Sequence, residues 1–76
     1  MTVPLDQVPT GTKAIIERIE GGHGALSRLY SLGLVPGREL DVLVNNFVGP
    51  IVVRVRDTTV SIGRGLARKV YVRVLG

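Results

Sequence analysis

The titratable side chains of this sequence offer one pair that could bind a metal ion. His23, the sole histidine, follows Glu20 by three residues, and ferrous iron accepts imidazole and carboxylate ligands. His23 also comes directly after Gly21-Gly22, a break at which an exposed loop residue is the plain alternative. We therefore keep His23 and Glu20 as candidate metal ligands, but we expect neither a resident metal nor a cofactor.

The residues that most catalytic sites need are missing from the sequence. The chain has no cysteine, which removes thiolate nucleophiles and disulfides and fits a reducing cytosol. No Ser-His-acid set can be assembled convincingly around His23, and no phosphate-binding P-loop motif occurs. We therefore predict that the protein is not an enzyme.

Basic side chains outnumber acidic ones and favour a binding function. Ten Lys and Arg residues against six Asp and Glu residues give a net charge of +4, which attracts anionic partners. Arg54 and Arg56 alternate on one face of a predicted strand, and Arg64 and Arg68 share a face if their segment is helical. We predict these four arginines as partner-binding residues, with a solvated outer face as the alternative.

Aromatic side chains are too few for two common kinds of binding face. The chain holds only Tyr30, Phe47 and Tyr71. Faces that bind single-stranded nucleic acid stack bases on aromatic rings, and grooves that bind proline-rich peptides are lined by them. We therefore do not expect nucleic acid as the partner.

The hydrophobic pattern predicts a mainly β fold in one domain, residues 1–76. Alternating apolar residues predict about five short strands, and the main helix follows the first of them. This order favours a small SH3-like β-barrel over an OB-like one, whose helix usually comes later. No apolar run approaches about 20 residues, so we do not expect the chain to span a membrane. The predicted strands are 12–20, 39–46, 51–56, 59–62 and 70–74, the helix is 23–32, and a helical turn lies within 63–70.

The densest turn chemistry lies between the helix and the second strand. Gly33 can adopt the left-handed conformation that ends a helix, and Leu34 then folds back on the helix. Pro36 and Gly37 occupy the second and third positions of a type II turn. We predict a structural role for these four residues. The same corner displays Arg28, Tyr30 and Arg38, which we predict as further partner-binding residues.

The order of these motifs resembles that of a known family. The stretch "LSRLYSLGLVPGREL" lies between "PLDQVPTGTKAIIERIEGG" and "VGPIVVRVRDTTVSIGRGLARKVYVRVL", and nearly the whole chain takes part. Together they resemble the ferrous iron transport protein A (FeoA) family. One departure is that residues 63–69 are basic and glycine-rich, where the family often has an acidic residue. The matching residues are Leu5, Pro9, Gly11, Gly21, Gly22, Leu29, Leu32, Gly33, Leu34, Pro36, Gly37, Gly49, Pro50 and Ala67.

The resemblance implies a fold, a location and a partner. The fold is an SH3-like barrel with the helix laid against it. The location is the cytoplasm, with recruitment to the inner face of the cell membrane. The partner is the membrane ferrous-iron transporter, the type B protein, which carries a cytoplasmic GTP-binding domain. Two alternatives stay open: an SH3-like module of a metal-dependent transcriptional regulator, and a basic barrel that binds nucleic acid. Valine-rich strands also leave a homo-oligomer open.

Overall fold

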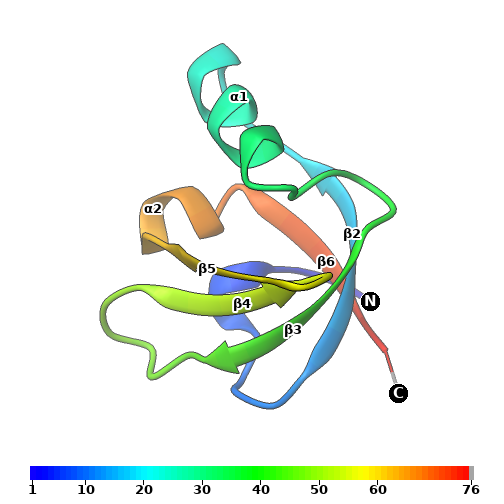
Figure 1. Ribbon diagram of the computed structural model, residues 1–76, viewed down its shortest axis with the longest axis vertical. Coiled ribbons are helices and arrows are strands. Elements are labelled where there is room, and N and C mark those ends of the chain that lie inside the picture. The colour runs from blue at the N-terminus through cyan, green and yellow to red at the C-terminus, as the bar shows by residue number, and fades with distance from the viewer. Residues whose placement is uncertain (76) are drawn as a thin grey trace.

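The computed structural model describes residues 1–75 and consists of one strongly curled antiparallel sheet with short helices at its ends (Figure 1). Alternating apolar residues place one side of each long strand inward. In β4, for example, Ile51, Val53 and Val55 are buried while Arg54 faces outward. The elements are β1 (Thr2–Pro4), η1 (Leu5–Gln7), β2 (Lys13–Ile19), α1 (His23–Ser31), β3 (Glu39–Val44), β4 (Ile51–Val55), β5 (Thr58–Ile62), α2 (Arg64–Ala67) and β6 (Val70–Leu75).

The strand order is β1-β6-β2-β3-β4-β5, so β2 lies between the last strand and β3. The register shifts between Ile16 and Arg18 where β2 pairs with β6, and between Val42 and Val44 where β3 pairs with β4. Such irregularities bend a strand and increase its twist. They let a sheet of short strands curl around one core (Figure 1).

The sequence analysis did not predict β1, because an alternating apolar pattern cannot be recognised in so short a segment. β1 has three residues, ends in Pro4, and pairs with β6 through Thr2 opposite Arg73 and Val3 opposite Val72. Proline is tolerated there because β1 lies at the end of the sheet order. The sheet therefore has six strands among residues 1–75, one more than the sequence predicted.

Arg56 does not belong to the strand that the sequence predicted for it. β4 ends at Val55, and Arg56 and Asp57 form the two-residue turn before β5. Arg56 has a φ of 56°. Two-residue hairpin turns require a left-handed residue because their twist then matches that of the strands. Arg56 therefore does not share a strand face with Arg54, contrary to the prediction.

The two helices occupy different places on the barrel (Figure 1). α1 stands above one end of the barrel, and Leu29 is its one fully buried residue. α2 packs against η1 beside the start of β6. Within residues 1–75, the helices are all too short to cross a membrane.

Candidate partner-binding surface

The corner after α1 has the hydrogen bonds of a Schellman helix stop. The Leu34 N–H donates to the Leu29 carbonyl at 2.9 Å, and the Gly33 N–H donates to the Tyr30 carbonyl at 3.0 Å. Gly33 has a φ of 88°, which residues other than glycine adopt only at a cost. Leu34 and Leu29 are both fully buried. The corner thus fixes the end of α1 against the barrel.

The type II turn follows directly and is tied to β2. The Arg38 N–H donates to the Val35 carbonyl at 3.1 Å, and Gly37 has a φ of 88°. The Gly37 N–H also donates to the Ile16 carbonyl at 2.7 Å, and the Ile16 N–H donates to the Arg38 carbonyl at 2.9 Å. These bonds set the direction in which α1 leaves the barrel.

α1 presents an apolar surface that the barrel does not cover. Leu26 is half-buried, and the Tyr30 side chain is 49% exposed. His23, Leu26, Ser27 and Tyr30 line a pocket of about 310 Å³ on this side of the helix. We call these four residues the α1 surface. Residues three and four apart share a helix face, so the four side chains are adjacent.

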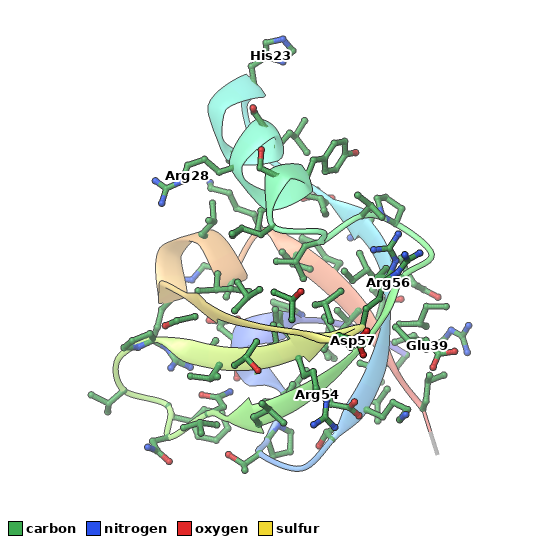
Figure 2. The ribbon with its side chains drawn as sticks, viewed as in Figure 1. His23, Arg28, Glu39, Arg54, Arg56 and Asp57 are labelled. Carbon is green, nitrogen blue, oxygen red and sulfur yellow. The ribbon has the colours of Figure 1, made fainter. Side chains whose placement is uncertain are left out.

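The three predicted residues of the corner do not form one site. Arg28 lies two residues before Tyr30, so the two side chains leave α1 on nearly opposite sides. In Figure 2, Arg28 points away from the helix toward solvent. Arg38 donates from Nη1 to the Gly33 carbonyl at 3.3 Å, which ties it to the helix stop. Of the three, Tyr30 alone belongs to the α1 surface.

The four arginines predicted as a patch also separate. Arg54 pairs with Asp41 at 3.5 Å on the outer face of the sheet, where Lys13 lies 3.7 Å from the same carboxylate. Arg56 occupies the turn after β4, on the opposite edge of the view from Arg28 (Figure 2). Arg64 and Arg68 belong to the region around η1, described next.

Arg64 is part of an internal network rather than a free surface charge. Its guanidinium donates to the Asp6 carbonyl at 2.8 Å, the Gly49 carbonyl at 3.0 Å and Asn45 Oδ1 at 3.1 Å. Asn45 is only 4% exposed, and its Nδ2 donates to the carbonyls of Asp6 at 3.1 Å and Val8 at 2.7 Å. The network joins η1, α2 and the β3–β4 loop.

Arg68 faces the buried carboxylate of Asp6. Its Nε lies 3.6 Å from Asp6 Oδ2, and Asp6 is 5% exposed. The other oxygen, Oδ1, accepts no hydrogen bond from the part of the chain that the structure describes. Removing one partner from a buried charge is costly. Arg68 therefore has a structural role as the ion-pair partner of Asp6.

A second ionic cluster fastens β1 to the barrel. The Thr2 hydroxyl and Arg73 Nε both donate to the carboxylate of Glu17, the latter at 2.8 Å. The Thr2 hydrogen bond, followed by that of Arg73, lowers the pKa of Glu17 below its ordinary value because both bonds favour the charged form. This carboxylate supports the fold and is exposed to solvent.

Within the described residues, the candidate metal ligands, His23 and Glu20, are not joined by further metal-ligating side chains. Glu20 accepts a hydrogen bond from Arg18 Nε at 2.9 Å, while His23 lies at the free end of α1 and points outward (Figure 2). Among residues 1–75, no three His, Cys, Asp or Glu side chains form a group that could hold a metal ion.

The aromatic side chains lie on three separate elements. Tyr30 is on α1, Phe47 is in the β3–β4 loop, and Tyr71 on β6 is covered by the Arg18 guanidinium at 4.3 Å. A stacking platform for successive bases needs neighbouring rings. The arrangement does not favour a nucleic-acid face.

Sequence reasoning missed the residues that hold the β3–β4 loop. Phe47 has a φ of 61°, and its N–H donates a hydrogen bond to Asn45 Oδ1 at 2.9 Å. The available signal was the polar pair Asn45-Asn46 after an alternating strand, because Asn and Asp favour side-chain-to-backbone bonds in turns.

Comparison with known proteins gives a consistent set of matches. Residues 3–74 match the FeoA domain family. A Methanocaldococcus jannaschii protein named for Fe(2+) transport (protein A) is 38% identical over 69 residues, which are 91% of this chain and 83% of that protein. The crystal structure of an iron uptake regulatory protein (FeoA) superposes with a TM-score of 0.94 at 44% identity, over 99% of this chain and 100% of that chain.

A manganese-dependent transcriptional repressor contains a similar barrel. It superposes with a TM-score of 0.89 at 26% identity, over 97% of this chain but only 42% of the repressor. The predicted SH3-like β-barrel is thus confirmed, and the same barrel occurs both alone and as part of longer regulators.

Proposed function

This chain belongs to the FeoA domain family, and we propose that it is an accessory protein of ferrous iron transport that acts by binding rather than catalysis. In this proposal its partner is the cytoplasmic GTP-binding domain of the type B membrane transporter. The match across residues 3–74 and the name of the M. jannaschii relative support the assignment to ferrous iron transport.

The α1 surface is the contact that we propose for the transporter. It combines a half-buried leucine, a largely exposed tyrosine and a histidine around one pocket, on a helix that stands clear of the barrel. Amphipathic helices commonly dock through anchors three and four residues apart, and tyrosine is enriched among residues that dominate binding energy. This observation carries the proposal.

The direct test is calorimetric titration of the chain into the purified GTP-binding domain, with Tyr30→Asn and Arg28→Gln as a pair. We expect Tyr30→Asn to weaken binding by roughly tenfold or more, as loss of an aromatic anchor does. Arg28→Gln changes an exposed side chain on the other side of the same helix and should leave the affinity within about twofold. Equal affinities for wild type and Tyr30→Asn would contradict the proposal that the α1 surface contacts the GTP-binding domain.

A regulatory module is the second candidate function, because the barrel of the manganese-dependent repressor is similar. In that case the chain would act as part of a longer, DNA-binding protein, since these residues span 42% of the repressor. The intact mass of the protein in its source cells distinguishes the two. A mass near 8.2 kDa supports the accessory protein, and a much larger mass supports the regulator.

A further inference from the structure

The β3–β4 loop presents the most exposed apolar side chains of its sheet. Val48 is 80% exposed and Phe47 is 53% exposed, and Val44 at the end of β3 is 39% exposed. The loop lies on the side of the barrel away from α1 (Figure 1). We call residues 46–50 the tip. Soluble proteins rarely display neighbouring large apolar side chains without a use for them.

The tip is held in one conformation. Asn45 Oδ1 accepts a hydrogen bond from the Phe47 N–H at 2.9 Å, and the buried Asn45 amide anchors the loop to η1 and Val8. Phe47 has a left-handed φ of 61°, which a bulky residue adopts only where its surroundings impose it. The protein therefore keeps Phe47 and Val48 outward instead of letting them fold onto the barrel.

Some backbone groups at the tip and its base have partners within the protein, including the Phe47 N–H and the Gly49 carbonyl. Thr10 Oγ1 accepts from the Asn45 N–H at 2.8 Å and donates to the Asn45 carbonyl at 3.3 Å. Arg64 Nη1 donates to the Gly49 carbonyl at 3.0 Å, and its guanidinium lies 5.9 Å from the centre of the Phe47 ring. Paired backbone groups lower the cost of leaving water.

The segments that form the tip and the neighbouring turn carry no charged side chains of their own. Residues 42–53 contain no Asp, Glu, Lys or Arg, and neither do residues 7–12, which Thr10 joins to Asn45. Positive charge begins at the border, where Arg64 lies beside Phe47 and where Lys13 and Arg54 together exceed the charge of Asp41.

We propose that the tip inserts into the surface of an anionic lipid bilayer, with Val48 and Phe47 entering the boundary between headgroups and acyl chains. Insertion at this boundary requires apolar side chains and no charge at the inserted end, with cations at headgroup level. The exposed Val48 and Phe47, the uncharged segment 42–53 and the cations at its border supply these features, and this combination of charge and apolar area matches an anionic lipid surface. The inference does not depend on the transporter, because lipid alone is the ligand.

The test is cosedimentation of the chain with vesicles of phosphatidylcholine and phosphatidylglycerol in equal parts. Wild type is compared with the double variant Phe47→Asn, Val48→Asn. Asparagine tolerates a left-handed backbone, so the variant removes apolar area without straining the loop. Tyr30→Asn is the matched control, because Tyr30 is an equally exposed aromatic at the other end of the molecule. A Phe47→Trp variant reports insertion directly through its fluorescence.

We expect the double variant to lower the bound fraction by about tenfold or more, and Tyr30→Asn to leave it unchanged. The emission of Phe47→Trp should shift to shorter wavelength with these vesicles and less so with phosphatidylcholine alone. Absence of wild-type binding, equal binding by the double variant, or an unshifted tryptophan would each overturn the proposal. If the double variant still bound vesicles but lost binding to the GTP-binding domain, the tip would be a protein contact. That result would also overturn the proposal.

Discussion

Asn45 and Arg64 hold together three segments that are distant in the sequence. The Asn45 side chain donates to Asp6 and Val8 and accepts from Phe47, while Arg64 bonds to Asp6, Asn45 and Gly49. Arg64 is thus a structural residue as well as a border residue of the tip. A partner that competed for its guanidinium would first have to break this network.

Asn45→Ala should lower the free energy of unfolding by about 2 kcal/mol or more, because the Val8 carbonyl loses its donor and the Phe47 N–H and Arg64 lose an acceptor. Urea unfolding measures this directly. Asn46→Ala, at the exposed neighbouring position, is the control and should change the value by less than about 0.5 kcal/mol. Similar values for the two variants would show that the Asn45 bonds contribute little.

Glu17 makes stability depend on pH in the acid range. Its folded pKa lies below the ordinary value of 4.5, so its contribution is fully present above about pH 4.5 and is lost as the pH falls through the folded pKa. Glu17→Gln should therefore flatten the decline in unfolding free energy below pH 4.5. Thr2→Val removes the largest cause and should raise the pKa of Glu17, as followed by NMR titration. An unchanged acid profile in Glu17→Gln would contradict this assignment.

At the scale of elements, the corner between α1 and β3 determines where α1 points. The helix stop is bonded to Leu29 and Tyr30, and the following turn is bonded to Ile16 of β2. The bonds of the helix stop join residues close in the sequence, and the bond to Ile16 lies beside the pairing of β2 with β3. The position of the α1 surface is therefore set by backbone geometry and not by extensive packing of the helix itself.

Gly33→Ala should lower the free energy of unfolding by about 1–2 kcal/mol, because alanine must adopt a left-handed conformation there. Space is not the obstacle, since an added Cβ would lie 3.8 Å from Arg38 Nη1 and 3.9 Å from Val55 Cγ1. Gly24→Ala, within α1 and with open space around it, is the control and should stabilise the protein by about 0.5 kcal/mol. Thermal or urea unfolding of the two variants should show opposite signs.

The sequence predicted the elements whose causes are local and missed those whose causes are distant. Gly33, Pro36 and Gly37 specify a helix stop and a turn by themselves, and the alternation in Ile51–Val55 specifies a half-buried strand. β1 forms because β6 pairs with it, and the roles of Asn45 and Arg64 depend on η1. These contacts join residues about 40 to 70 positions apart, which no local pattern encodes.

At the scale of the whole molecule, the two apolar surfaces lie at different ends. α1 stands above one end of the barrel, and the tip of the β3–β4 loop lies away from it (Figure 1). A chain arranged in this way can rest on a bilayer through the tip while α1 extends toward a protein partner. The homo-oligomer expected from the valine-rich strands stays a prediction.

Uptake of ferrous iron tests the central claim most directly. Cells that contain the transporter but lack this chain are complemented with wild type, with Tyr30→Asn or with Arg28→Gln, at matched amounts of folded protein. We expect wild type and Arg28→Gln to restore uptake, and Tyr30→Asn to leave it near the level without the chain, because the α1 surface has lost its aromatic anchor. Equal uptake with and without the chain would contradict the claim that it is an accessory protein of ferrous iron transport.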